Sequence, residues 1–273
     1  MGKFRIRCSS LGDLMAGSIR PSLTKEIEAI LKKVEDGKEL TSLQSQKLGD
    51  YNAKMAAPPE PSAGMKTLGK NWYTEQRYQR RKISLGGAAT MKGIKMEEDA
   101  IKYTESVLGF FGWEKNEEHL SNDYLMGTPD VITDNYIIDL KCSYDCFSFD
   151  PTDIEINSDY WHQLQGYMAL TGVDKAILVY ALMDLPKDMV MNECWRVARS
   201  RGLDEVTEEL FEEVEQYNTY SNLPDNMRVK AFFFDAVDGY AKEVEDRVGI
   251  VRNYINTLDA PNVITAEGEK IYL

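Results

Sequence analysis

The chain has 273 residues, of which 43% are hydrophobic and 28% are charged, so it is long and apolar enough for a large folded core. Its formal net charge of −13 argues against a protein that coats nucleic acid non-specifically over its whole surface. No run approaches the roughly 18 to 20 apolar residues of a membrane-spanning helix, and the first residues lack the apolar stretch of a secretory signal. We therefore expect a cytoplasmic protein without a membrane partner.

Cysteine and histidine usage gives no sign of a structural metal cluster. The four cysteines are scattered, and none forms a Cys-x-x-Cys pair: Cys8, Cys142, Cys146 and Cys194. Only two histidines exist, and neither has the spacing of a zinc site. We expect reduced and mostly buried thiols; Cys142 and Cys146 could share a metal only with distant ligands.

The N-terminal third reads as helices joined by a loop. After a short strand-like start, residues 22–35 and 39–54 have helical periodicity. Residues 55–64 are rich in proline and small residues and predict a loop, and a basic helical segment follows at 72–82. The Gly-Gly loop at 84–90 lacks the Lys-Ser/Thr of a nucleotide-binding loop.

Positive charge is concentrated in one part of this acidic chain. Residues 66–95 hold eight basic side chains against one acid, Glu75. Such a stretch can form a basic face for a polyanion while the acidic remainder keeps the protein soluble. An ordinary solvated helix is the alternative.

From residue 95 onward helices and strands alternate. The pattern predicts a helix at 96–111, strands at 113–119, 124–132 and 136–143, a helix at 158–171 and a strand at 175–181, in the order αβββαβ. An acidic helix at 204–216, a strand at 228–234 and a helix at 237–257 follow. We predict an α/β (α+β) protein with a central mixed sheet flanked by helices. Its domains would be an N-terminal helical region, 1–92, packed on a core formed by 93–273.

The chemically informative segment runs from Gly127 to Lys141. Asp139 and Lys141 are two apart in an apolar strand, so their side chains should share one face of the sheet. Asp130 precedes Asp139 by nine residues, which lets a hairpin bring it alongside. Two carboxylates and a lysine suit phosphodiester hydrolysis, as oxygen ligands for Mg²⁺ and a cation that orients water. The alternative is a turn aspartate and an exposed charge pair.

Two further segments could contribute to the same site. Glu97 and Glu98 fall in the first turn of the predicted helix, where the helix dipole already favours acids. Gln163 and Tyr167 are four apart and therefore share one helical face. Their amide and phenol could hold a phosphate or a water, or they could belong to an ordinary half-buried helix.

These motifs, in this order, resemble the PD-(D/E)xK nuclease superfamily, in particular its RecB-like and lambda-exonuclease-like (YqaJ-type) branch. The resemblance implies a restriction-endonuclease-like core and a catalytic set of Glu97, Asp130, Asp139, Lys141, Gln163 and Tyr167. It implies Mg²⁺ or Mn²⁺, one or two ions per site, held by Asp130, Asp139, the main-chain carbonyl of Leu140, and Glu97 with Glu98 as its alternative. Lys141 would position or activate the attacking water, and Gln163 would steady Lys141 or the phosphate. DNA contacts would come from Ser9, Ser10, Arg77, Arg80, Arg81 and Lys82.

The resemblance also implies an activity. It favours a metal-dependent exonuclease that acts on DNA ends in phage-type recombination or repair, in a bacterial host cell if the gene is a phage's. A structure-specific or restriction-like endonuclease, or a DNA-binding protein that does not cut, are the alternatives. Implied partners are DNA, a single-strand annealing or recombination protein, and further copies of the chain in a ring-like trimer. Serine or cysteine hydrolysis has no support, because no Gly-x-Ser-x-Gly elbow is present.

Overall fold

The computed structural model describes residues 2–83, 86–265 and 268–272, and these residues form two compact units. We call one the sheet unit, which consists of Arg5–Gly12 and Ile83–Ala241. The other is the terminal unit, which consists of Met1–Phe4, Asp13–Lys82 and Lys242–Leu273. Both ends of the chain therefore belong to one unit.

This division differs from the predicted domains 1–92 and 93–273, which placed the last helix with the core. Long-range polar contacts explain why that helix groups with the N-terminal segments. Arg252 donates to the carbonyl of Phe4, with Nη2 at 2.7 Å. Arg247 donates to the carbonyls of Leu14 and Gly17, each at 3.2 Å. Such pairings have no local signature in the sequence.

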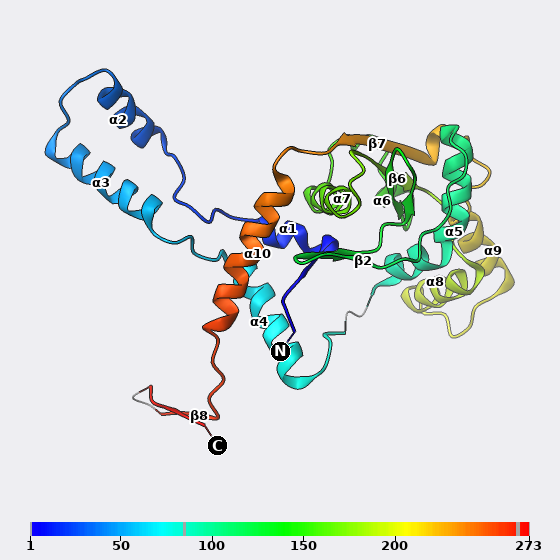
Figure 1. The fold of residues 1–273 in the computed structure, drawn as a ribbon. Helices are drawn as coiled ribbons and strands as arrows, with labels where there is room; N and C mark the ends of the chain where they lie inside the picture. Colours follow the sequence, from blue (N-terminus) through cyan, green and yellow to red (C-terminus); the bar gives the residue numbers. More distant parts are fainter. Residues whose placement is uncertain (1, 84–85, 266–267, 273) are drawn as a thin grey trace. The chain divides into compact units, whose positions relative to one another are not determined.

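The terminal unit is mainly helical (Figure 1). It contains α2 (Lys25–Glu35), α3 (Ser42–Ala56), α4 (Ala63–Tyr78), most of α10 (Tyr240–Asn256) and a hairpin of β8 (Val263–Ile264) and β9 (Lys270–Ile271). Three helices begin at side-chain caps, which satisfy free amides of the first turn: Thr24, Thr41 and Ser62. α2 packs against α3, and the loop between α3 and α4 matches the predicted proline-rich stretch.

The basic helix of this unit differs from its prediction. α4 begins nine residues before Trp72 and ends at Tyr78, because Gln79 adopts a left-handed conformation with φ 52°. Arg80, Arg81 and Lys82 therefore follow the helix and do not belong to it.

The sheet unit holds a four-stranded mixed sheet and a small three-stranded sheet. The larger has the order β4 (Val131–Ile132), β5 (Ile137–Cys142), β6 (Lys175–Ala181) and β7 (Val229–Asp235). β5 and β6 are parallel, and the other two pairings are antiparallel. In the smaller sheet, β3 (Leu125–Gly127) lies between β1 (Ile6–Arg7) and β2 (Leu120–Ser121).

Helices cover both faces of the larger sheet (Figure 1). On one face, Ile138 and Leu140 of β5 pack with Ala100 and Ile101 of α5 (Ala88–Leu108). The opposite face carries α7 (Ser158–Thr171), which follows the short helix α6 (Cys146–Phe149). α8 (Lys187–Ser200) and α9 (Glu208–Tyr217) pack on each other, and the 3₁₀ turns are η1 (Cys8–Ser10) and η2 (Asp225–Met227). The short helix α1 (Leu11–Met15) crosses the division between the units.

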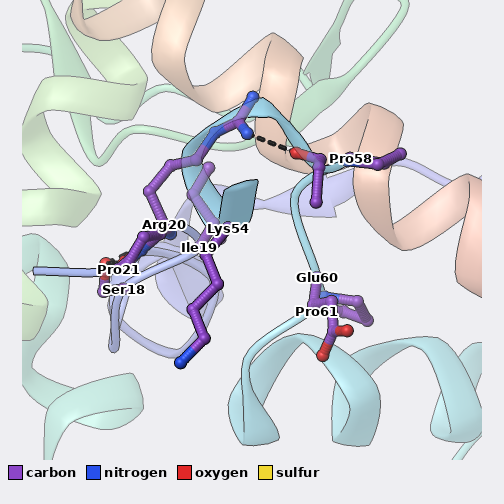
Figure 2. A pocket seen from close by; sticks show the side chains of 9 residues that line it. Ser18, Ile19, Arg20, Pro21, Lys54, Pro58, Glu60 and Pro61 are labelled. Atoms are coloured by element: carbon purple, nitrogen blue, oxygen red, sulfur yellow. Dashed lines mark hydrogen bonds between the residues drawn. The ribbon is translucent and has the colours of Figure 1, made fainter. Parts of the chain in front are cut away.

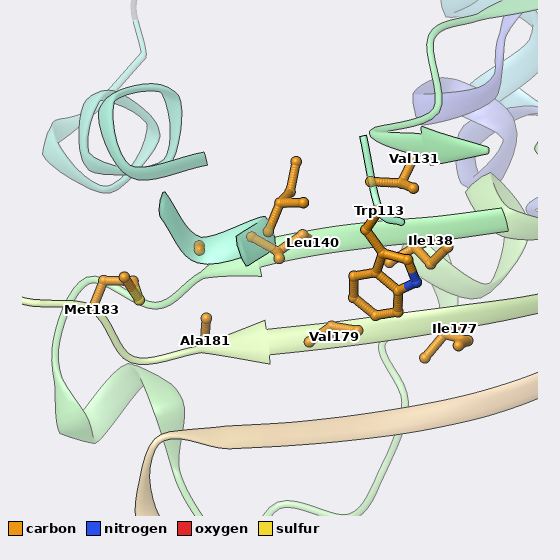
Figure 3. Close-up of a cluster of buried hydrophobic side chains, with 10 residues drawn as sticks. Trp113, Val131, Ile138, Leu140, Ile177, Val179, Ala181 and Met183 are labelled. Atoms are coloured by element: carbon orange, nitrogen blue, oxygen red, sulfur yellow. The ribbon is translucent and has the colours of Figure 1, made fainter. Parts of the chain in front are cut away.

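The core between β5, β6 and α5 is closely packed (Figure 3). Ile177 and Val179 of β6 lie beside Ile138 and Leu140 of β5, under the indole of Trp113. Ile177 is fully buried. This packing holds β5, the strand that carries Asp139 and Lys141, in place against β6 and α5.

We predict that Ile177→Ala destabilises the protein by about 2–5 kcal/mol, because it removes buried methyl groups and leaves a cavity. Urea unfolding followed by circular dichroism measures the change. Ile154→Ala is the matched control, since Ile154 is 82% exposed; it should change stability by less than about 0.5 kcal/mol. Equal effects of the two substitutions would contradict the packing described here.

Several predicted elements were found where expected, and others were not. α7 and β6 have the predicted bounds. Residues 113–119 were predicted as a strand, but Lys115 makes only an isolated bridge with Val131. The strand at 124–132 is split into β3 and β4, because Pro129 lacks the N–H that continues a ladder. α8 and the β8–β9 hairpin were not predicted.

Two further findings on the described residues concern membrane-spanning helices and the cysteine thiols. None of their helices combines the length and hydropathy needed to cross a bilayer. All four cysteines are free; Cys8 and Cys194 are buried, and Cys142 and Cys146 are half-buried. Burial raises the pKa of the Cys8 thiol, and that of Cys142, to about 12.

Candidate active site

An acid and a lysine on β5 form the centre of the candidate site. Alternation along the strand turns Ile138 and Leu140 toward α5, so Asp139 and Lys141 face α7. Asp139 is almost fully buried, and its Oδ2 lies 2.6 Å from Nζ of Lys141. This contact is an ion pair, and Oδ2 has no other polar partner among the described residues.

Asp130 reaches the same place from the neighbouring strand. The last paired residues of β4 and β5 are Val131 and Ile138, so continuing this register by one residue sets Asp130 across from Asp139. Its Oδ2 accepts a hydrogen bond from the backbone N–H of Leu140 at 2.7 Å. In an extended strand the N–H and C=O of one residue point to the same edge, so the carbonyl of Leu140 also points toward Asp130.

Two acids and one lysine share a buried environment, and this burial affects their pKa values. Burial, and then the negative charge of Asp139, raises the pKa of Asp130 to about 7. Burial acts to lower the pKa of Lys141, but the charges of Asp139 and Asp130 outweigh it and the pKa is raised. The lysine therefore carries a positive charge between the two carboxyl groups. A second cation would be well placed here, because two buried carboxylates exceed one ammonium in charge.

A chain of hydrogen bonds from α7 supports Asp139. Nε2 of Gln163 donates to Oδ1 of Asp139 at 3.1 Å and to the hydroxyl of Tyr167 at 2.9 Å. The Tyr167 hydroxyl in turn donates to the carbonyl of Thr128 at 3.1 Å. The chain thus joins β5, α7 and the segment that carries Asp130. Gln163 and Tyr167 are both buried.

Two glycines permit this close packing. A Cβ at Gly127 would lie 2.7 Å from Cε1 of Tyr167, so a side chain there would push the ring away. A Cβ at Gly166 would lie 2.2 Å from Cδ1 of Leu11 and 3.0 Å from Sγ of Cys8. Glycine at these positions lets α7 approach β3 and the segment 8–11 closely enough for the hydrogen bonds to form.

We predict that Tyr167→Phe costs about 1 kcal/mol of stability, because the Thr128 carbonyl loses its donor and Gln163 loses an acceptor. For the nuclease activity that the sequence predicts, kcat should also fall with little change in KM, because Asp139 is less firmly held. Urea unfolding and initial rates at saturating DNA measure the two effects. Tyr217→Phe, at a residue that is 63% exposed, is the control. Unchanged stability and kcat would show that the chain has no supporting role.

Glu97 and Glu98 are distinguished by their surroundings. Both acids pair with Lys115, at 3.4 Å for Glu97 and 4.0 Å for Glu98. The side chain of Glu97 is 25% exposed and that of Glu98 is 68% exposed. The charge of Glu97 also contributes to the raised pKa of Asp130. Of the two, Glu97 is therefore the one oriented toward the acids.

The helix that carries Glu97 starts earlier than predicted. α5 begins at Ala88, so Glu97 lies in its third turn and its first turn contains no acid. The helix dipole therefore does not account for the acids at 97 and 98, and that alternative is wrong. The physical reason is that the two alanines, the methionine and the lysine within residues 88–92 are good helix formers after the Gly-Gly pair. Residues 84 and 85 of the predicted 84–90 loop lie outside the described residues.

Tyr160 belongs to this group of residues and was not singled out from the sequence. Nζ of Lys141 lies 4.7 Å from the centre of its ring. The ring makes an edge contact with Tyr180 of β6, with centroids 6.3 Å apart. Tyr160 precedes Gln163 by three residues, so helical spacing could have placed both on one face. Only the fold shows that this face meets Lys141.

The remaining predicted residues lie elsewhere. Ser9 and Ser10 form η1, which packs against α7 in the sheet unit. Arg77, Arg80, Arg81 and Lys82 belong to the terminal unit. Two members of the predicted basic stretch do not contribute to a free basic face. Lys92 is buried and donates to the carbonyls of Tyr144 and Met183, and Lys95 pairs with Asp188.

A hollow in the terminal unit has different chemistry. It has a volume of about 420 Å³ and is lined by Ser18, Ile19, Arg20, Pro21, Lys54, Ala57, Pro58, Glu60 and Pro61 (Figure 2). Arg20 uses its Nη1 to bind the carbonyls of Met55, at 2.7 Å, and Ala57, at 2.5 Å. This hollow contains none of the predicted site residues, and its arginine is engaged in holding the loop after α3.

The acids do not form a ready-made metal cluster. Over residues 2–83, 86–265 and 268–272, no group of three or more His, Cys, Asp and Glu side chains is arranged to hold an ion. The reason lies in their present partners: Glu97 contacts Lys115, Asp139 contacts Lys141, and Asp130 accepts from Leu140. The donor set nevertheless suits a hard cation, since magnesium is commonly held by one or two carboxylates with water. Oδ2 of Asp139 accepts no hydrogen bond, and a cation bound there would share or replace its ion pair with Lys141.

Comparison with known proteins gives a result for structure and none for sequence. No protein-family model matches the chain, and no curated protein is detectably similar to it in sequence. A solved structure of a phage-related exonuclease from Haemophilus somnus 129PT superposes with a TM-score of 0.61 at 19% identity, covering 93% of this chain and 95% of that one. The chain has the fold of that exonuclease.

A second group of solved structures shows the same fold. An alkaline exonuclease from Laribacter hongkongensis, LHK-Exo, superposes with a TM-score of 0.51 at 14% identity, covering 92% of this chain and 88% of that one. Its complex with dAMP gives 0.52 at the same identity and coverage. The resemblance to lambda-exonuclease-like nucleases is thereby confirmed for the fold, as is the α+β class with a mixed sheet flanked by helices.

Proposed function

We propose that this protein is a nuclease that hydrolyses phosphodiester bonds in DNA, acting from DNA ends with the help of a divalent cation. The observation that carries the proposal is the convergence of Asp130, Asp139 and Lys141 on neighbouring strands, with Gln163 beside them. The fold adds support, because the structurally similar proteins are exonucleases and match over nine tenths of this chain.

Mg²⁺ or Mn²⁺ would be held by Asp130, Asp139 and the carbonyl of Leu140, with Glu97 as a direct or water-mediated ligand. Such an ion stabilises negative charge on the phosphate and lowers the pKa of a bound water. One or two ions per site are compatible with this donor set. The buried pair of acids, held side by side on neighbouring strands, supports the assignment.

The side chains around the acids would have separate tasks. Lys141, held between Asp139 and the ring of Tyr160, would orient the attacking water or the scissile phosphate. Gln163 would keep Asp139 in position, and Tyr167 would anchor Gln163 to the Thr128 carbonyl. Ser9 and Ser10 lie on η1 against the same helix, where their hydroxyls could bind a terminal phosphate.

The basic segment after α4 would bind DNA through its phosphates. We predict that replacing Arg80 and Arg81 with alanine weakens DNA binding and reduces the slope of log K against log salt by about 1 to 2. Fluorescence anisotropy in EDTA, at several salt concentrations, measures this slope. The control replaces Lys25 and Lys32 of α2, which are equally exposed. A slope unchanged from that of the control would leave the segment as an ordinary solvated surface.

The proposal is tested by incubating linear and closed-circular DNA with Mg²⁺, Mn²⁺ or EDTA. We expect loss of linear DNA from its ends with either cation and none with EDTA. Nicking of circles would instead indicate a structure-specific or restriction-like endonuclease. Binding without any cleavage would overturn the nuclease and leave a DNA-binding protein.

The biological setting that we propose is recombination or repair in phage-type replication, where an exonuclease works with a single-strand annealing protein. A ring-like trimer would explain how an acidic protein stays on DNA, because it encloses the duplex without needing a broad basic surface. Light scattering after size-exclusion chromatography measures the number of copies. A monomer at working concentration would remove the ring from the proposal and leave the chemistry unchanged.

A further inference from the structure

One face of α4 forms a hollow that the chemistry above does not use. Its lining comes from two segments of the terminal unit, α4 and the residues that follow α10: Lys70, Tyr73, Thr74, Arg77 and Tyr78, with Leu258, Asp259 and Ala260. The α4 residues follow the spacing i, i+3, i+4, i+7 and i+8, which places them on one side of the helix. We call this the α4 hollow. Its volume is about 340 Å³, which is within the range of roughly 300–1,000 Å³ of sites for small ligands.

Lys70 and Arg77 line the α4 hollow and belong to a segment whose basic side chains are free to bind an anion. In the terminal unit six of them lie between residues 66 and 82, all exposed: Lys66, Lys70, Arg77, Arg80, Arg81 and Lys82. None has a side-chain partner among the described residues. Some exposed lysines and arginines elsewhere, such as Lys47, Arg201 and Lys242, are paired with acids. The feature of this segment is that six unpaired cations fall close together in a chain of net charge −13.

The acid in the lining is already neutralised. Asp259 accepts a hydrogen bond from Nζ of Lys270 at 3.0 Å and another from the hydroxyl of Tyr272. These contacts lower the pKa of Asp259, so its charge is matched by that of Lys270. The repulsion between this acid and a phosphate is therefore offset. Lys70 and Arg77 give the lining a net positive charge.

Two tyrosines give the hollow a second kind of chemistry. Tyr78 is 66% exposed, and Tyr73 is half-buried one turn before it. Exposed aromatic rings beside a positive groove are typical of sites that bind single-stranded nucleic acid, because bases stack on the rings while cations contact the backbone. Bases in a duplex are stacked on each other and offer no free face. The combination favours an unpaired strand.

We propose that the α4 hollow binds one nucleotide of single-stranded DNA. The base stacks on Tyr73 or Tyr78, and its phosphates contact Lys70 and Arg77. The inference rests on the proposed function in taking DNA as the substrate. An exonuclease that removes one strand of a duplex leaves the other strand unpaired, and this site would hold the enzyme on that strand.

The test measures binding of a fluorescently labelled 16-nucleotide oligo-dT by anisotropy in EDTA, so that cleavage plays no part. The double variant Tyr73→Ala/Tyr78→Ala should bind about 5- to 150-fold more weakly. Tyr73→Phe/Tyr78→Phe keeps the rings and should stay within about 2-fold of the unaltered protein. Tyr217→Ala, at an exposed tyrosine of the sheet unit, controls for loss of any aromatic side chain. Thermal unfolding checks that each variant is folded.

A second pair of measurements separates the contribution of the basic side chains to binding from that of the tyrosine rings. Lys70→Ala/Arg77→Ala should reduce the salt slope for oligo-dT by about 1.4, since each phosphate contact contributes about 0.7 for single strands. A blunt 16-base-pair duplex should lose much less affinity than oligo-dT in the Tyr73→Ala/Tyr78→Ala protein.

The inference is overturned if Tyr73→Ala/Tyr78→Ala binds oligo-dT like the unaltered protein, or if duplex and single strand weaken equally. Cleavage is measured separately with Mg²⁺ on the unaltered protein. Normal cleavage with unchanged oligo-dT binding in the variant would remove this site alone. Absence of cleavage with the expected loss of oligo-dT binding would remove the nuclease and keep the site.

Discussion

Asp139→Asn is expected to give a folded protein that no longer cuts DNA. The substitution keeps the size of the side chain, and the new amide oxygen can still accept the hydrogen bond from Gln163. It removes the charge that would bind the cation, and metal stabilisation of a phosphoryl transition state is worth several kcal/mol. We therefore expect kcat to fall by about 1,000-fold or more. Release of acid-soluble nucleotides from linear duplex DNA, with Mg²⁺ or Mn²⁺, measures the rate.

The matched control is Asp134→Asn, in the turn between β4 and β5. It makes the same chemical change at an exposed position of the same hairpin and should leave the rate within about 2-fold, as surface substitutions generally have small effects. Urea unfolding shows whether each variant retains its fold. Cleavage by folded Asp139→Asn at the rate of the control would refute the assignment of Asp139, and with it the proposed site.

Lys141→Met should cause the second largest loss. Methionine keeps an unbranched side chain against the Tyr160 ring but removes the ammonium that lies 2.6 Å from Oδ2 of Asp139. Groups that orient or activate an attacking water contribute about 10²- to 10⁴-fold to a rate. We expect a fall of that size in kcat, with DNA affinity in EDTA changed far less, since at most one phosphate contact is lost.

Lys175→Met on the parallel strand β6 is the control for this prediction, because Lys175 is exposed at the start of its strand. It should cleave like the unaltered protein. If Lys141→Met lost affinity for DNA in proportion to its rate, the lysine would be a binding residue and not a participant in hydrolysis. If both variants cleaved normally, Lys141 would have no role in the reaction.

Asp139 could be placed in the candidate site from the local sequence pattern, whereas Tyr160 could not. Alternation of side chains along a strand is a property of the backbone, so Asp139 and Lys141 could be placed on one face from the sequence alone. Helical spacing likewise placed Gln163 and Tyr167 together. The contact between Lys141 and the Tyr160 ring joins two elements through the fold, and nothing in either segment indicates the other.

The boundaries of helices and strands also divide into those that the local sequence marks and those that it does not mark. The bounds of α7 and β6 were predicted because apolar periodicity and the flanking Gly172 mark them locally. The start of α5 was misplaced, since Ala88 and Ala89 carry no periodic signal although alanine forms helix readily. Residues 113–119 are all polar after Trp113 and pair only through Lys115, because strand formation depends on a partner that the local sequence does not supply.

The sequence by itself predicted the residues of the candidate site, two acids, a lysine and a glutamine at spacings set by strand and helix geometry, and it determined the α+β arrangement around a mixed sheet. The tertiary structure decided which segments meet. It grouped the two ends of the chain through Arg252 and Phe4, which are 248 residues apart, and it separated the free basic side chains from the buried Lys92 and the paired Lys95. Contacts of that range are chosen by packing of the whole chain, because no local preference links residues so distant in sequence.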